Sequence, residues 1–282
     1  MTTLLLEVMR IRAGKRSAPD VLRRYREDRF SAPAAVPAHR LRAAEDAVVS
    51  ALPTDFALLT LAPIAPLGTH SALATVDQNK VVSTARGSEV AADPTNALAL
   101  EAALRRRQSS RTEPKSDDVV RLAAAQRVVR AQQVTGRATF AHFALFGAVS
   151  AGRDAGNLAF ERQHIVEHLG FAAKATQAAV GGRVEISLTS LTPGFAPVVL
   201  AAHDAFEDQH DVEIVGDPHR GTGRGYYLGL CFKVYSVLGD DRIEVGDGGF
   251  VDWTRTLLGN RKERLLISGL GIDRLATLSP AR

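Results

Sequence analysis

Three glycine-rich segments near the end of the sequence decide the expected fold: TGRGYYLGLCFKVY at residues 222–235, GDGGFVDWTRTLLGN at residues 246–260 and LLISGLGIDRL at residues 265–275. In the first, a paired tyrosine precedes an apolar run that is typical of a β-strand. The second is expected to form a glycine turn, and the third carries an arginine spaced by glycines. Glycine lets the backbone approach a ligand closely, so this region predicts a small-molecule pocket.

The composition is that of a globular protein. Of the 282 residues, 45% are hydrophobic, which is enough to build a full core. A single cysteine, Cys231, excludes an intramolecular disulfide and a cysteine-based metal cluster, and it favours a reducing, cytoplasmic location. No segment approaches the roughly 18 apolar residues of a membrane span, so no membrane association is expected.

Charge and metal-binding patterns are weaker guides. The net charge of +4 comes mostly from scattered arginines, with one dense run at residues 105–111; a solvated surface is the favoured interpretation, and RNA binding is the alternative. HIVEH at residues 164–168 matches the His-x-x-Glu-His zinc pattern. Five residues match easily by chance and no third ligand can be identified, so we assign no metal site.

Helical and strand patterns alternate along the chain. AHRLRAAEDAVVSAL at residues 38–52 has an apolar face at helical spacing. An apolar strand with two prolines is expected at 56–68, strand pieces up to residue 86, and a helix from Asp93, whose carboxylate can cap free amides. Residues 107–118 are polar and charged, which predicts a surface loop.

The middle of the chain predicts a β-hairpin followed by alternating helices and strands. Residues 119–133 and 135–152 are expected to be its two strands, joined by a turn at Gly136. A long amphipathic helix is predicted at 157–180, where a glycine pair follows it. A strand, a helix and a short strand then lead to the C-terminal segments.

In this order, the segments resemble the catalytic core of class II aminoacyl-tRNA synthetases, most closely histidyl-tRNA synthetase and its paralogue, the regulatory subunit of ATP phosphoribosyltransferase. The resemblance covers roughly residue 40 to the C-terminus. It implies an α+β fold, a class II synthetase-like antiparallel sheet flanked by helices. We expect one domain over residues 1–282, with residues 1–37 as an N-terminal extension and no anticodon-binding domain.

Particular motifs carry this resemblance. GYYLGLCFKVY is similar to the histidine-pocket motif, and LLISGLGIDRL resembles motif 3, whose arginine lies against ATP. ADPT at residues 92–95 resembles the Glu-x-Thr step that holds the substrate ammonium, and VRAQ at 129–132 resembles the Arg-x-Glu of motif 2. The implied catalytic residues are Arg130 and Arg274. The implied substrate-binding residues are Asp93, Thr95, Gln132, Arg137, Tyr226, Tyr227 and Gly229.

The resemblance also implies cofactors and partners. In adenylate formation a carboxylate attacks the α-phosphorus of ATP, and charge builds up on the phosphate oxygens. Two arginines and Mg²⁺ can stabilise that charge, so ATP and Mg²⁺ are the expected cofactors. The helix at 38–52 and the proline-ended strand after it resemble motif 1, the dimer-forming element, and imply a homodimer.

Several positions depart from the family pattern. The arginine of Arg-Gly-x-x-Tyr-Tyr is replaced by Thr222, although Arg220 is nearby, and the acid near the end of the tyrosine strand is replaced by Lys233. The polar residue of the returning motif 2 strand is Leu145, and an Arg-Tyr pair is replaced at 250–251 by Phe-Val. We therefore expect a pocket that does not bind histidine as the synthetase does.

Three classes of function remain open. Arg130 and Arg274 favour an enzyme that activates a carboxylic acid with ATP. Thr222, Gln132 and Lys233 favour a non-catalytic regulatory subunit that binds an effector and a partner enzyme. The third class is an RNA-binding module, although recognition of tRNA in the family's way is not expected without an anticodon-binding domain. A structural role also remains open for each site residue, such as a helix cap for Asp93 or strand packing for the tyrosines.

Overall fold

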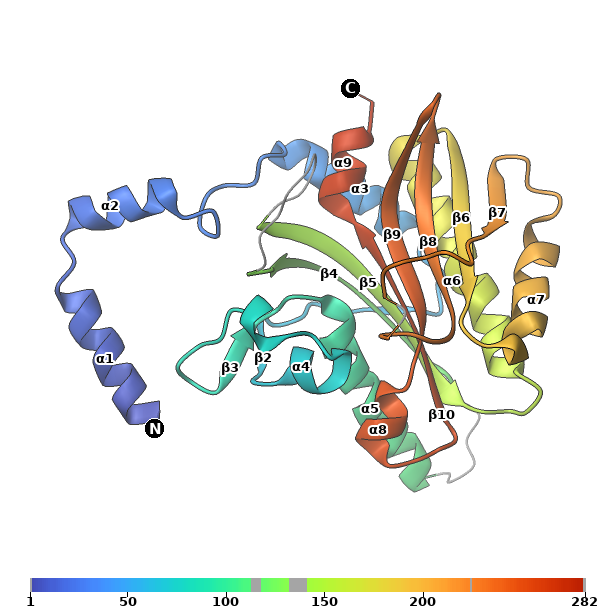
Figure 1. Cartoon of the computed structure of the whole chain (residues 1–282), viewed down its shortest axis with the longest axis horizontal. Helices are drawn as coiled ribbons and strands as arrows, with labels where there is room; N and C mark the ends of the chain where they lie inside the picture. Colours follow the sequence, from blue (N-terminus) through green and yellow to red (C-terminus); the bar gives the residue numbers. More distant parts are fainter. Residues whose placement is uncertain (1, 113–117, 132–140, 224, 281–282) are drawn as a thin grey trace.

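A mostly antiparallel sheet forms the centre of the molecule (Figure 1). The computed structural model describes residues 2–112, 118–131, 141–223 and 225–280. Within them, an eight-stranded sheet has the order β1-β4-β5-β10-β9-β8-β6-β7, in which the two outermost pairs are parallel. The strands are β1 (Ala57–Leu58), β4 (Val120–Val129), β5 (His142–Arg153), β6 (Arg183–Ser190), β7 (Val212–Gly216), β8 (Leu228–Leu238), β9 (Asp241–Val251) and β10 (Glu263–Gly271). The predicted α+β architecture is confirmed.

Helices cover both faces of this sheet. Along β5, Phe146 belongs to a core with Val48 and Leu169, whereas Val149 belongs to a second core with Leu98, because successive side chains of a strand point to opposite faces. The first face carries α3 (Ala38–Ala51), α6 (Ala159–Val180), α7 (Ala196–Phe206) and α9 (Ile272–Leu278). The second carries α4 (Thr69–Ala74), α5 (Pro94–Thr112) and α8 (Trp253–Leu258).

Two helices precede α3. They are α1 (Thr2–Gly14) and α2 (Ala18–Glu27), and Figure 1 shows them lying away from the sheet. At the start of α2, Ser17 and Asp20 form a reciprocal capping box, which satisfies amides that have no partner inside the helix. Among the described residues, no helix combines the length and the apolar character needed to cross a bilayer.

Several predicted elements are confirmed, including the helix at 38–51, the β4–β5 hairpin and the long helix α6. The turn at Gly136 lies outside the described residues. The strand pieces expected between residues 72 and 86 are wrong, because this stretch contains the end of α4 and a short 3₁₀ helix at Gln78–Lys80. Within it, the strand-like pairing is an isolated antiparallel bridge between Ser83 and Glu89, and the regular ladder of β2 (Ile64–Pro66) with β3 (Ser88–Val90) lies on either side of the stretch.

The loop expected at 107–118 is also wrong over its first part, because α5 continues to Thr112. Arg106 explains the longer helix. Its guanidinium is fully buried and binds both carboxylate oxygens of Glu263 on β10, at 3.0 and 3.1 Å. A buried charge is stable only when it is paired, so this ion pair fixes the later turns of α5 against the sheet.

The glycine turn expected at residues 246–249 is wrong, because these glycines lie inside β9. The neighbouring side chains explain why glycine is needed there. A Cβ atom at Gly249 would lie 2.6 Å from the ring of Tyr227, and one at Gly248 would collide with the ring of Phe232. The glycines therefore make room for aromatic side chains of the adjacent strand region, and the Tyr227 ring can lie flat against β9.

Candidate functional site

A pocket of about 240 Å³ lies on the second face of the sheet, over β5, β9 and β10 and beside the start of α5. It brings together six residues predicted from the sequence. They are Asp93, Thr95, Arg130, Tyr226, Tyr227 and Arg274. Gln132 and Arg137 lie outside the described residues, and Gly229 lines neither this pocket nor its neighbour.

Asp93 performs two tasks at the start of α5. One carboxylate oxygen, Oδ1, accepts the backbone N–H of Thr95 at 2.9 Å and its hydroxyl at 2.7 Å, which is the helix-capping role considered from the sequence. The other oxygen, Oδ2, lies 3.4 Å from Nη2 of Arg130. Asp93 is therefore both a cap and a charged group of the pocket wall.

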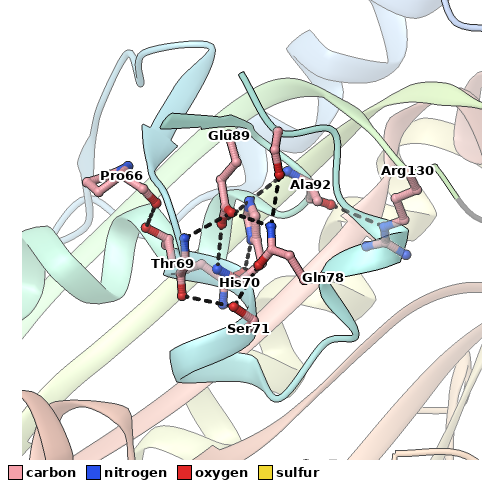
Figure 2. A network of polar contacts seen from close by, with 11 residues as sticks. Pro66, Thr69, His70, Ser71, Gln78, Glu89, Ala92 and Arg130 are labelled. Atoms are coloured by element: carbon pink, nitrogen blue, oxygen red, sulfur yellow. Dashed lines mark hydrogen bonds and ion pairs between the residues drawn. The ribbon is translucent and has the colours of Figure 1, made fainter. Parts of the chain in front are cut away.

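A buried polar network fixes the peptide that carries Asp93 (Figure 2). Glu89 is fully buried and accepts the backbone N–H groups of Gly68 and His70, at 3.0 and 2.9 Å. Nε2 of His70 accepts the backbone N–H of Ala92 at 3.1 Å, and the Ala92 carbonyl accepts Nε of Arg130 at 3.1 Å. Sequence reasoning missed this network, because a glutamate in a short strand gives no signal of burial.

The tyrosines contribute hydroxyl groups and aromatic surface. Tyr226 packs edge-to-face on Tyr227, with ring centroids 4.8 Å apart, and is hydrogen-bonded to the side chain of Thr95. The hydroxyl of Tyr227 donates to Oδ2 of Asp247 at 3.3 Å. Burial, reinforced by neighbouring carboxylates, raises the pKa of both tyrosines well above the ordinary value, so both hydroxyls keep their protons.

Asp247 is a functional-site residue that sequence reasoning missed, and Arg220 is one that the sequence placed near the motif position but out of register. The buried guanidinium of Arg220 donates to the carbonyls of Thr222 and Phe232, at 2.7 and 2.9 Å, and lies 3.5 Å from Oδ2 of Asp247. Burial raises the pKa of Asp247; Arg220 opposes the rise, and Glu244 and Asp93 reinforce it. Aligning the paired tyrosines with the family motif places Thr222 at the position of the motif arginine. In the structure the backbone turns back at Gly223, whose φ is 78°, and Arg220 is the arginine that lies near Asp247.

Cationic and aromatic groups also line the pocket. Arg274, in the first turn of α9, donates to the carbonyl of Glu244 at 3.0 Å and is 39% exposed. The guanidinium of Arg130 lies 5.1 Å from the ring centroid of Phe143. Lys233, at the position where the family has an acid, pairs with the Glu244 carboxylate at 2.7 Å, so the neighbouring strand supplies a carboxylate in its place.

A second pocket of about 310 Å³ adjoins the first. Five residues line both pockets: Asp93, Arg130, Tyr226, Tyr227 and Asp247. The second pocket extends from this shared boundary towards α4 and the loop that carries Arg220. The two volumes together offer space for a nucleotide and a second small molecule.

The histidines of the HIVEH segment have structural partners. His168 is buried between the hydroxyls of Ser150 and Ser268, at 2.9 and 2.8 Å, and Nδ1 of His164 lies 2.6 Å from Glu167. Among the described residues, no group of three or more His, Cys, Asp or Glu side chains is arranged to hold a metal ion.

The fold is that of class II aminoacyl-tRNA synthetases, as comparison with solved structures establishes. The apo histidyl-tRNA synthetase of S. aureus has a TM-score of 0.59 and 12% identity over 85% of this chain. The ATP phosphoribosyltransferase regulatory subunit/histidyl-tRNA synthetase of Bacillus halodurans has a TM-score of 0.64 and 12% identity over 89% of this chain and 82% of its own. Pyrrolysyl-tRNA synthetase of Desulfitobacterium hafniense has a TM-score of 0.54 and 16% identity over 92% of this chain and 74% of its own.

These likenesses exist in structure and not in sequence. No family model matches the chain, and no curated protein matches it. The matched region spans 64% of the S. aureus enzyme. The resemblance inferred from the three C-terminal segments is thus confirmed for the fold, and the activity has to be argued from the pocket.

Proposed function

We propose that this chain binds ATP together with an amino-acid-like carboxylic acid and joins them as an acyl adenylate. One observation supports this most directly: a single pocket is lined by the guanidinium groups of Arg130 and Arg274, by the aromatic ring of Phe143, and by Asp93 and Tyr226. Guanidinium groups suit phosphate oxygens, and an aromatic face suits a nucleobase. A carboxylate beside a tyrosine hydroxyl suits an ammonium group.

The reaction follows from this arrangement. A carboxylate oxygen of the acid attacks the α-phosphorus, the bond between that phosphorus and the oxygen bridging to the β-phosphate breaks, and pyrophosphate leaves. Arg130 and Arg274 would donate hydrogen bonds to the phosphate oxygens on which charge develops. Asp93, fixed by the cap and by the Ala92 peptide, would hold the ammonium, so that alignment supplies much of the acceleration.

The donor set also fits Mg²⁺ that arrives with ATP. Such ions are usually held by one or two carboxylates together with phosphate oxygens, and Glu244 and Asp247 are the carboxylates of β9 that line the pocket. When bound, Mg²⁺ would neutralise phosphate charge. Glu244 would have to exchange its contact with Lys233 for this role.

The test is ATP–pyrophosphate exchange with each of the amino acids, combined with calorimetric titration of ATP. We expect ATP binding that Arg274→Ala weakens about tenfold or more, since a hydrogen bond to a charged group contributes about 1.5–3 kcal/mol. Arg162→Ala, on the exposed side of α6, is the matched control and should bind like wild type. Absence of both exchange and ATP binding would overturn the proposal.

A regulatory subunit is the second candidate, and one contact favours it. Arg130 is already paired with Asp93 and with the Ala92 carbonyl, so without ligands the two charges compensate each other. A chain that binds ligands in this way and lacks exchange activity would suit an effector-binding partner of a phosphoribosyltransferase. Co-purification with a purified ATP phosphoribosyltransferase, in the absence of exchange, would support it.

Nothing in the described structure favours RNA binding through the basic run at 105–111. Arg106 is buried against Glu263, and Arg105 pairs with Glu101 at 2.8 Å. Phosphate binding needs basic groups that gather on one accessible face. We therefore retain the two ligand-binding proposals, and for both we propose that the protein acts in the cytoplasm.

A further inference from the structure

We infer that the second pocket selects a ligand whose side chain ends in a carboxylate or a carboxamide. The inference rests on the proposed function, in which the ligand ammonium is held at Asp93 and Tyr226. These residues lie on the boundary that the two pockets share. A side chain that starts at this boundary and leads away from the nucleotide wall enters the second pocket.

Asn96 supplies an unmatched donor in the wall of that pocket. It is 1% exposed, and its Oδ1 lies 2.6 Å from Nδ1 of His70. Because Nε2 of His70 accepts from Ala92, the ring proton of neutral His70 lies on Nδ1, so Oδ1 of Asn96 is the acceptor. The amide nitrogen Nδ2 is then left buried without a partner in the described chain.

A buried amide donor without an acceptor is energetically unfavourable, so the position favours a ligand that brings an acceptor. Lys80 adds a second donor, because it lines the same pocket. The lysines that form ion pairs in the part of the chain that the structure describes are Lys233 and Lys262. The ammonium group of Lys80 is therefore available to bind a ligand.

The charge balance of the pocket points the same way. Lys80 and Arg220 line the second pocket but not the first. The acids that line the second pocket, Asp93 and Asp247, both line the first pocket as well. These two acids already contact Arg130, Arg220 and Tyr227. A carboxylate or amide oxygen would accept from Lys80 and Asn96, whereas an ammonium or imidazolium group would meet two cations.

The experiment is calorimetric titration of the full chain with L-glutamate, L-glutamine, L-norleucine and L-lysine. We expect glutamate or glutamine to bind about tenfold or more tightly than norleucine or lysine. Lys80→Met should remove about tenfold of that preference, whereas ATP binding should persist, because Lys80 does not line the first pocket. Asn96→Asp keeps the acceptor for His70 and removes the Nδ2 donor. Combined with Lys80→Met, it should weaken glutamate binding more than Lys80→Met does alone. Lys174→Met, exposed on α6, is the matched control.

Two results would overturn the inference. One is lysine or norleucine binding as tightly as glutamate and glutamine, and the other is a preference that Lys80→Met leaves undiminished. If ATP still binds in either case, the proposed function stands and only the selectivity is wrong. If neither ATP nor any amino acid binds, the proposed function falls and this inference falls with it.

Discussion

The carboxyl group of Asp247 gives the pocket a pH dependence of its own. Its pKa is raised in the folded chain, chiefly by desolvation, so the folded state holds this proton more tightly than the unfolded state does. Ionising Asp247 therefore costs stability as the pH rises above the ordinary value of 3.8. Because the side chain is still 48% exposed, solvent screening keeps the resulting effect on stability small. We expect Asp247→Asn to raise the melting temperature at pH 7 and to change it little at pH 4.

Thermal unfolding followed by circular dichroism at both pH values measures this difference. Asp208→Asn, at an exposed position after α7, is the control and should show no pH-dependent change. A variant that melts lower than wild type at pH 7 would mean that the contact with Arg220 outweighs burial.

Gly229 is required by the packing around it. Its φ is 69°, and a Cβ atom there would collide with the ring of Phe195. Left-handed backbone and a steric clash each cost about 1–3 kcal/mol. We expect Gly229→Ala to lower the free energy of unfolding by about 2–4 kcal/mol in urea denaturation. Gly194→Ala meets no neighbouring atom and should stay within about 0.5 kcal/mol of wild type.

At the scale of elements, His168 anchors α6 to the sheet through Ser150 of β5 and Ser268 of β10. Burial lowers its pKa to about 3. A histidine whose pKa is lowered by folding contributes stability that is complete above pH 6.5 and is lost as the pH falls below that value. We expect the wild-type chain to lose about 3 kcal/mol of unfolding free energy through this group between pH 7 and pH 4.

Urea denaturation at pH 7 and pH 4 tests this loss. His168→Gln should be less stable than wild type at pH 7, and its stability should fall less on acidification. His203→Gln, exposed on α7, should follow the wild-type pH dependence. An identical acid loss in wild type and His168→Gln would contradict the assignment.

Local patterns predicted the elements whose stability is mainly local. The helix at 38–51 and the β4–β5 hairpin could be predicted because their apolar spacing matches their period. The region around α4 could not, because Glu89 holds the start of that helix from a different strand. For the same reason, the motifs identified Asp93 and Arg130, whereas Arg220 and Asp247 emerged only once distant segments had been brought together.

At the scale of the molecule, the two faces of the sheet have different roles. Its first face packs on α3, α6, α7 and α9 and provides most of the core. Its second face, under α5 and α8, holds the pocket. Since the ion pair of Arg106 with Glu263 joins α5 to β10, the helix that directly follows Asp93 is fixed to the strand that leads into α9 and Arg274. Asp93, a candidate for substrate binding, and Arg274, a candidate for catalysis, thus lie next to elements that this ion pair joins.

The segment after α3 bears on the oligomeric state. It carries three large apolar side chains, those of Leu58, Ile64 and Leu67, that are 49–53% exposed, and β1 is an edge of the sheet. Exposed apolar groups beside an open edge favour association, so we expect a homodimer through this segment. Light scattering after gel filtration should give twice the monomer mass for wild type and the monomer mass for Ile64→Lys. Leu200→Lys, 61% exposed on α7, should remain dimeric; a monomeric wild type, or dissociation by both variants, would place the interface elsewhere or exclude it.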